Sequence, residues 1–323
     1  MKCLFVGSST MDVTVVSKKI TKANLAQEHF EKFACIAFAS KTTVEDLVLE
    51  PGGSAANSAV TFSKLGGKAA LLSAVGNDVF SSLISTSLKQ DKVDVSRIKK
   101  IPGKSSVGVI IVDSSGEKSV LVHKGVNDLL SEKHFSDSLL KGINVVVLCS
   151  LASEQNFALF EKIVSSAKKL KKKIVFAPSI TMLRSRSKEL KKMHSKFDLT
   201  IMNLEEAFYY TGEKSLSRAF RKLGSPCVIT ADKQGAYAFD GRHAYHIHAP
   251  SVAVKDSTGA GDSFTGAFVH AFFAKDLKTA LKQATAAAGL NLSDVGARFK
   301  FNSKDLASFI KKHSDELFVR TIE

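Results

Sequence analysis

Residues 255–268, KDSTGAGDSFTGAF, decide the fold of this chain. Gly259, Ala260 and Gly261 stand directly before Asp262, and apolar residues then recur at intervals of three and four. This spacing predicts a helix with one buried face and with Asp262 in its first turn. Backbone amides at a helix N-terminus form an anion site when little side chain covers them. We therefore expect a helix start that binds an anion.

The carboxylate of Asp262 does not suit a plain anion site, and two interpretations account for it. A base can take the proton from an attacking hydroxyl while the neighbouring amides hold a transferring phosphoryl group, which is the chemistry of a kinase. An aspartate can also simply cap a helix that begins after glycines. The spacing alone does not distinguish a catalytic base from a helix cap, so other parts of the sequence are needed to decide.

The composition excludes several classes of protein. The 323-residue chain is 44% hydrophobic, enough to bury a large core. No apolar run approaches the roughly 20 residues of a membrane span, and the first residues contain no secretory apolar core. The four cysteines lie far apart, as in proteins that keep their thiols reduced. We therefore expect a cytoplasmic protein without membrane association.

The net charge of +15 owes much to two basic runs, at 168–173 and 184–192. Such runs attract anions in general, nucleotides and nucleic acid included. Neither run interleaves aromatic residues, so the sequence favours a solvated surface over a nucleic-acid site. The non-enzymatic alternative is a scaffold of kinase-like fold that binds nucleic acid or a protein through this surface.

Apolar strand-like runs alternate with helical patterns along most of the chain, which predicts a parallel sheet covered by helices on both faces. Two segments, roughly 13–50 and 104–123, break this alternation. They predict extra strands, including a hairpin at 106–123 whose turn is Ser-Ser-Gly. Such strands would form a small sheet able to close over a site. Inside the first segment, residues 21–33 have a helical pattern.

Three further stretches carry polar groups suited to a substrate. GSSTMD ends in Asp12, which is either an acceptor for sugar hydroxyls or part of a surface turn. PGGSAANSA is a second glycine-led helix start with Asn57 in its first turn, or a packing turn. NLEE, at 203–206, follows a strand end, where ligands of open α/β sheets gather. Its carboxylates could organise Mg²⁺, or it is an ordinary helix start.

Together and in this order, these stretches resemble the ribokinase-like (PfkB-type) family of carbohydrate and nucleoside kinases. DSTGAGDSF is similar to the C-terminal signature of that family and GGSAANSA to its N-terminal signature, and the resemblance covers nearly the whole chain. It implies a single Rossmann-like three-layer αβα domain over residues 1–323, with a small β-sheet lid. The implied reaction transfers the γ-phosphoryl group of ATP, with Mg²⁺, to a hydroxyl of a small molecule.

The resemblance also implies a role for each matched position. Asp262 is similar to the catalytic base, and the amides of Gly259, Ala260 and Gly261 are similar to the anion hole that stabilises developing charge. The residues matched to the acceptor-binding set are Asp12, Gly53, Asn57 and Asp256. Those matched to the nucleotide-binding set are Asn203, Glu206, Thr230 and Gly235. Glu206 would hold Mg²⁺ indirectly, through water. Asp256 would face the acceptor or a monovalent cation.

The sequence departs from the family pattern at several positions. Asp232 replaces the first glycine of the nucleotide turn, which puts the path of that turn and the identity of the donor in question. Ala177 stands where many members carry an aspartate near the phosphates. Arg298 and Lys300 stand where members that bind K⁺ carry a small polar residue. A built-in cation could replace K⁺ here, or the K⁺ site is absent.

The acceptor is weakly specified. Ser54 follows the glycine pair at a position where many ribokinases and sugar-phosphate kinases carry lysine, which argues against a phosphofructokinase. We expect a sugar or nucleoside, with ribose or a ribonucleoside favoured over a hexose, and a sugar-phosphate kinase as the alternative. An open sheet leaves unpaired edges, so we also expect a homodimer through the lid.

Overall fold

The computed structural model describes residues 1–322 except 28–29, 37, 40, 114–117 and 225, and it gives no side-chain description for 21–33. Within these residues, the main sheet has the strand order β17-β16-β15-β14-β13-β12-β11-β1-β6. Neighbours from β6 to β14 pair in parallel, and those from β14 to β17 pair antiparallel. The strands are β1 (Lys2–Val6), β6 (Lys68–Leu72), β11 (Val145–Leu148), β12 (Lys173–Phe176), β13 (Leu199–Asn203), β14 (Cys227–Thr230), β15 (Ala236–Phe239), β16 (Ala244–Ile247) and β17 (Arg320–Ile322).

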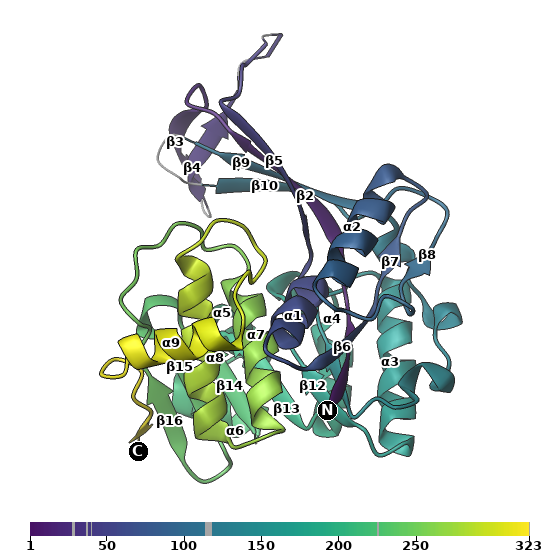
Figure 1. Ribbon diagram of the computed structural model, residues 1–323, viewed down its shortest axis with the longest axis vertical. Helices are drawn as coiled ribbons and strands as arrows, with labels where there is room; N and C mark the ends of the chain where they lie inside the picture. Colours follow the sequence, from purple (N-terminus) through teal and green to yellow (C-terminus); the bar gives the residue numbers. More distant parts are fainter. Residues whose placement is uncertain (28–29, 37, 40, 114–117, 225, 323) are drawn as a thin grey trace.

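Helices cover both faces of this sheet (Figure 1). One hydrophobic cluster joins the first face to α1 (Ser54–Lys64), α2 (Val79–Gln90), α7 (Ala260–Phe272), α8 (Leu277–Leu292) and α9 (Ser303–Lys312). A second cluster joins the other face to α3 (Glu154–Lys169), α4 (Ile180–Met193), α5 (Leu204–Thr211) and α6 (Leu216–Leu223). Short 3-10 turns lie at η1 (Gly125–Leu129), η2 (Glu132–His134), η3 (Asp137–Leu140), η4 (His194–Lys196) and η5 (Asp232–Gln234).

The sequence of β1 shows why both faces are covered. Cys3 and Phe5 belong to the first cluster, whereas Leu4 and Val6 belong to the second. Successive side chains of a strand point to opposite faces, so a strand that is apolar throughout requires packing on both sides. The three-layer αβα architecture predicted from the alternation of strands and helices is confirmed.

A smaller sheet has the order β10-β9-β2-β5 and stands away from the main body, above the loops that precede α7 and α9 (Figure 1). Its strands are β2 (Thr10–Val16), β5 (Asp46–Gly52), β9 (Ser106–Val112) and β10 (Lys118–His123). The chain enters this sheet directly from β1 and leaves it directly into α1, so a short path links it to the main domain. The expected Ser-Ser-Gly turn between β9 and β10 lies outside the described residues.

The helical expectation for residues 21–33 is wrong. The segment contains β3 (Thr21–Gln27) and the start of β4 (Phe30–Cys35), which pair antiparallel with a register shift between Asn24 and Gln27. Helix propensities differ by less than about 1 kcal/mol per residue, so pairing between two adjacent strands outweighs a weak helical pattern. A further short pair, β7 (Ala74–Val75) and β8 (Lys99–Lys100), is parallel.

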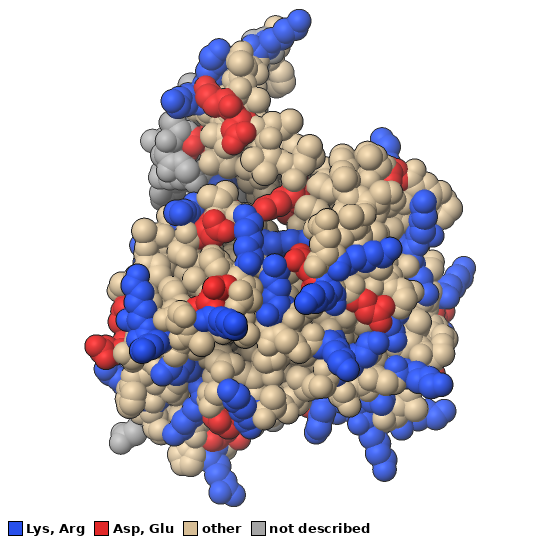
Figure 2. Space-filling model, in the orientation of Figure 1, with Lys and Arg blue, Asp and Glu red and all other residues tan. Residues whose placement is uncertain are grey.

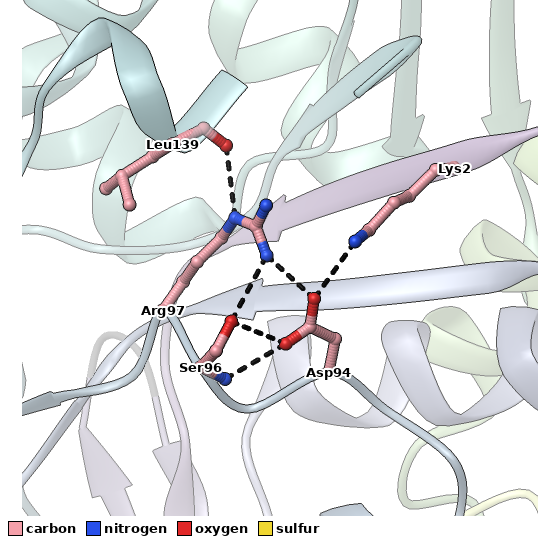
Figure 3. Close-up of polar contacts among 5 residues, drawn as sticks. All are labelled: Lys2, Asp94, Ser96, Arg97 and Leu139. Carbon is pink, nitrogen blue, oxygen red and sulfur yellow. Dashed lines mark hydrogen bonds and ion pairs between the residues drawn. The ribbon is translucent and has the colours of Figure 1, made fainter. Parts of the chain in front are cut away.

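A polar network fastens the start of β1 to the loop after α2 (Figure 3). Asp94 accepts hydrogen bonds from the backbone and hydroxyl of Ser96, and pairs with Lys2 at 3.0 Å and with Arg97 at 2.7 Å. Arg97 also donates to the carbonyl of Leu139. Desolvation raises the pKa of Asp94, but the hydrogen bonds and cations outweigh it and hold that pKa well below its usual value.

Within the described residues, no helix is both long and apolar enough to cross a membrane.

Candidate active site

Helix α7 begins at the small-residue segment that the sequence singled out. Gly259 precedes it with φ of 75°, a left-handed conformation that favours glycine, and a side-chain carbon there would overlap the carbonyl of Ala297. Asp262 lies in the first turn, as the spacing predicted. The N-cap residue is Gly259, which makes no side-chain cap hydrogen bond, and Asp262 lies three residues after it. Capping therefore does not account for the carboxylate of Asp262.

The carboxylate of Asp262 faces α1 instead. Its Oδ2 accepts a hydrogen bond of 3.0 Å from Nδ2 of Asn57. Desolvation raises the pKa of Asp262 to about 7; the bond from Asn57 opposes that shift, and the charges of Asp12 and Glu206 add to it. A carboxyl group with a pKa near neutrality can accept a proton under physiological conditions.

Asn57 is buried in the first turn of α1, and its Oδ1 atom has no hydrogen-bond partner among the described residues. A buried amide oxygen without a partner costs about 1–3 kcal/mol, so it marks a position where a ligand donor can bind. Gly53, just before α1, has φ of 100° and packs against the backbone of Ser8 and Ser9. Gly53 thereby aims the start of α1 at the start of α7.

Asp12 is on strand β2 of the small sheet and not in a surface turn. Its carboxylate accepts a hydrogen bond of 3.0 Å from Thr10 and lies over Gly52 and Gly108, where any side chain would overlap it. Burial raises the pKa of Asp12 despite the bond from Thr10, and the guanidinium of Arg298 partly offsets this. The two glycines therefore leave the space that this carboxylate occupies.

A cavity of about 180 Å³ lies at the carboxyl ends of the central strands. Asn203 and Thr230 line it from the ends of β13 and β14, and Gly261 and Asp262 line it from the first turn of α7. This is the edge of a parallel sheet where ligands bind in open α/β folds. Among the described lining residues, the carboxylates are those of Asp262 and Glu206.

The expected Mg²⁺ element, Asn203 with Glu206, forms a reciprocal cap of α5. Each side chain accepts a hydrogen bond of 2.8 Å from the backbone amide of the other residue. Desolvation raises the pKa of Glu206 to about 7, against the hydrogen bonds from the amides of Asn203 and Ile180. No cluster of three or more metal-ligating side chains exists among the described residues. A carboxylate tied to amides fits Mg²⁺ that is held through water and substrate phosphates.

The turn that we expect to bind the nucleotide follows β14. Thr230 lines the cavity, and Gly235 packs against the backbone of β16 and of the residues that follow it. Asp232 has φ of 45°, so it adopts the left-handed conformation for which the family pattern has glycine. The turn therefore keeps a glycine-like path although its first glycine is replaced.

Asp256 does not line the cavity. Its carboxylate pairs with Nζ of Lys118, on β10 of the small sheet, and accepts hydrogen bonds from the amides of Thr258 and Gly296. Burial raises the pKa of Asp256, but these partners, Lys118 foremost, bring it below its usual value. Sequence reasoning missed Lys118, because no local pattern marks a contact between residues 138 positions apart.

The residues present do not fit a bound K⁺. Lys118 engages the carboxylate of Asp256 and the hydroxyl of Thr258, and Lys300 donates to the carbonyl of Val295 at 2.6 Å. Two ammonium groups thus already bind oxygen atoms of the loops before α7 and α9. Arg298 uses Nη1 to contact Ser87 on α2 and Asp91 just after it, and its Nε and Nη2 have no hydrogen-bond partner among the described residues.

A family model described as pfkB family carbohydrate kinase matches residues 3–304 of the chain. Among curated proteins, the chain is 27% identical to a ribokinase of Bacillus subtilis, over 91% of this chain and 93% of that one. It is 26% identical to a deoxyribokinase of Salmonella typhi, and the match covers 78% of this chain and 84% of that one. A ribokinase II candidate from E. coli, solved in complex with ATP and Mg²⁺, is 22% identical, with a TM-score of 0.82 over 97% and 99% of the two chains.

Proposed function

Because this chain belongs to the pfkB family of carbohydrate kinases, we propose that it transfers the γ-phosphoryl group of ATP to a hydroxyl of ribose or of a ribose-containing nucleoside. The chain is a sugar kinase by family, a phosphotransferase with a hydroxyl acceptor. The finer assignment rests chiefly on one observation. Asp262 lies in the first turn of α7, where its carboxylate accepts a hydrogen bond from Asn57 and lines the cavity at the carboxyl ends of the strands.

In the proposed mechanism, Asp262 is the general base. The acceptor oxygen forms a bond to the γ-phosphorus while the bond from that phosphorus to the bridging oxygen breaks. The hydroxyl proton moves to the carboxylate of Asp262, whose raised pKa suits it to hold that proton near pH 7. The amides of Gly259, Ala260 and Gly261, at the bare N-terminus of α7, stabilise the charge on the phosphoryl oxygens.

In this proposal, ATP binds in the cavity at the carboxyl ends of the central strands. The relative solved with ATP and Mg²⁺ supports the same donor and metal here. Thr230 and Gly235 border the nucleotide, while Asn203 and Glu206 act on the Mg²⁺ shell through water. Mg²⁺ bound to the phosphates would neutralise charge that develops during transfer. Ala177 lines the cavity without a carboxylate, so Glu206 and Asp262 are the acidic residues among the described residues that line it.

The acceptor lies between the small sheet and the first turn of α1. Asp12 offers a carboxylate from β2, and Asn57 offers the unpartnered Oδ1, so both can accept hydrogen bonds from sugar hydroxyls. Gly53 lets the backbone that leads into α1 pack against Ser8 and Ser9. A sugar phosphate would need a cation in this pocket. The guanidinium of Arg298 is buried and its charge is balanced by the carboxylates of Asp91, Glu50 and Asp12, which favours an uncharged acceptor.

We propose that the small sheet acts as a lid. It carries Asp12 on β2 and stands over the loops before α7 and α9, joined to the main body through β1 and α1 (Figure 1). A lid that closes on the acceptor excludes water, which would otherwise compete for the phosphoryl group. Figure 2 shows lysine and arginine side chains around the junction of lid and body, with others spread among carboxylates over the drawn face. Such a distribution favours anionic substrates over a nucleic-acid groove.

The lid also has the features of a dimer interface. Its edge strands expose large apolar side chains: Leu47 and Leu49 on β5, and Val120, Leu121 and Val122 on β10. Exposed edge strands with apolar side chains pair readily with a second chain. We expect a homodimer of about twice the 34.8 kDa chain mass. Light scattering at micromolar concentration tests this, and a monomeric mass would contradict it.

A panel of acceptors tests the proposed function. Ribose, deoxyribose, hexoses, their phosphates and common nucleosides are each incubated with ATP and Mg²⁺, and ADP formation is measured. We expect the highest kcat/KM for ribose or a ribonucleoside. Preference for a sugar phosphate would refute the acceptor assignment, and a lack of turnover with every acceptor would refute the assignment as a ribosyl kinase.

A further inference from the structure

Lys118 of the lid makes a polar contact with the loop that leads into α7. Its Nζ pairs with Oδ1 of Asp256 and donates to Oγ1 of Thr258 at 3.0 Å. About a quarter of the Lys118 side chain is exposed, and 13% of that of Asp256. Salt screens a partly buried ammonium–carboxylate pair less than it screens a pair on an open surface.

Asp256 in turn fixes the segment that presents the glycine amides. Its Oδ1 accepts from the amide of Thr258 at 2.7 Å, and its Oδ2 accepts from the amide of Gly296 at 3.1 Å. The carbonyl of Ala297, next to Gly296, packs on Gly259 so closely that no side chain fits there. One carboxylate therefore joins the loop before α7 to the loop before α9, and both loops touch the backbone that begins α7.

A second ammonium holds the other loop. Lys300 donates to the carbonyl of Val295 at 2.6 Å and pairs with Glu50 of β5 at 3.4 Å and with Asp294 at 3.7 Å. The lid therefore contacts these loops through Lys118 of β10 and through Glu50 of β5. Both contacts are between opposite charges, and both are made by residues at sheet edges.

We propose that Lys118 is a positioning residue. Its ammonium group, carried by the lid, is the cation that orders Gly259, Ala260 and Gly261, so the kinase needs no bound monovalent cation. The proposal rests on the proposed function, since it concerns the geometry of the same amides. Because Lys118 belongs to β10, the cation reaches Asp256 only when the lid lies over the main domain. Closure of the lid and completion of the anion hole are therefore one event.

The test compares the wild-type enzyme with Lys118→Ala, Lys118→Arg and the control Lys104→Ala, which changes an exposed lysine just ahead of β9. Activity is measured with saturating ATP and acceptor in tetramethylammonium, sodium, potassium or ammonium chloride at one ionic strength. We expect wild-type kcat to vary by less than about twofold among the salts, since a built-in cation saturates the site. A misplaced catalytic segment can cost up to about 10²-fold, so Lys118→Ala should lose at least tenfold in kcat.

Rescue distinguishes positioning from a loss of folding. Ammonium or propylammonium ions should restore part of the kcat of Lys118→Ala and leave Lys104→Ala unchanged, whereas tetramethylammonium should not. Lys118→Arg should keep most of the activity because it retains a cation. Activation of the wild type by potassium of tenfold or more over tetramethylammonium would overturn the proposal, as would normal kcat in Lys118→Ala. An inactive wild type would instead refute the proposed function.

Discussion

The side-chain amide of Asn57 donates to Oδ2 of Asp262 at 3.0 Å, and this bond joins the first turns of two helices 205 residues apart in sequence. One helix follows the strand that returns from the lid, and the other follows the glycine segment. The bond lowers the pKa of Asp262 against the stronger effect of desolvation. Asn57 thus both orients the proposed base and tunes it, and its Oδ1 has no hydrogen-bond partner among the described residues.

Asn57→Ala should weaken acceptor binding and make the base harder to ionise. We expect kcat/KM for the acceptor to fall at least about tenfold, the value of a hydrogen bond to a charged group. The acidic limb of the pH–rate profile should move to higher pH, because the hydrogen bond that favours the ionised carboxylate is gone. Unchanged kinetics at all pH values would contradict the assigned role of Asn57.

The pH dependence of the wild-type enzyme follows from the raised pKa of Asp262. The base must be ionised to accept a proton, so kcat/KM should rise with unit slope below pH of about 7 and level off above it. Glu206 also has a pKa of about 7, so Glu206→Gln is the matched control. The rise of kcat/KM with pH should persist in Glu206→Gln. If that rise disappeared in Glu206→Gln, the titrating group would be Glu206.

Asp232 is expected to strain the nucleotide turn. Its φ of 45° costs a non-glycine residue about 1–2 kcal/mol, partly offset by the extra flexibility that glycine gains when unfolded. Asp232→Gly should therefore raise the free energy of unfolding by about 0.5–1 kcal/mol, as judged by chemical denaturation. Asp232→Ala, which keeps a side-chain carbon, should not stabilise the protein. Equal stabilisation by both variants would show that the gain comes from removing the carboxylate.

The network around Asp94 should contribute to stability and not to catalysis (Figure 3). The pKa of Asp94 in the folded protein lies below its usual value of 3.8, so the stabilisation is complete above pH of about 4 and is lost as pH falls further. Asp94→Asn should lower the free energy of unfolding at pH 7 by about 1 kcal/mol or less, because the carboxylate is partly solvated. The difference from wild type should shrink toward pH 3, with kcat unchanged. A difference independent of pH would exclude the ionised carboxylate as its source.

The sequence predicted those features that local pattern controls. The apolar runs in strands such as β1 predicted a sheet packed on both faces, and the spacing after Gly261 predicted the first turn of α7 with Asp262 in it. Both follow from periodicities that a few consecutive residues impose. The helical expectation for 21–33 was wrong because strand pairing between β3 and β4 outweighs a weak propensity.

Features that depend on contacts distant in sequence could not be predicted. The pairing of Lys118 with Asp256 arises only when the lid folds over the main domain. The placement of Asp12 within a strand, over Gly52 and Gly108, likewise depends on the register of three strands. The positions of Arg298 and Lys300 predict a cation from either residue in place of K⁺. Of the two, Lys300 binds the carbonyl of Val295, whereas the cation at Asp256 is Lys118 of β10.

The most direct test of the account is the rate of acceptor phosphorylation by Asp262→Asn, measured in a single turnover with ATP, Mg²⁺ and the best acceptor of the panel. Asparagine keeps the shape of the side chain and cannot take the proton, so we expect a rate about 10²–10⁴-fold below wild type. The melting temperature should be unchanged or higher, because the buried group no longer ionises as pH rises. A folded Asp262→Asn variant that transfers the phosphoryl group at a near-wild-type rate would contradict the central claim.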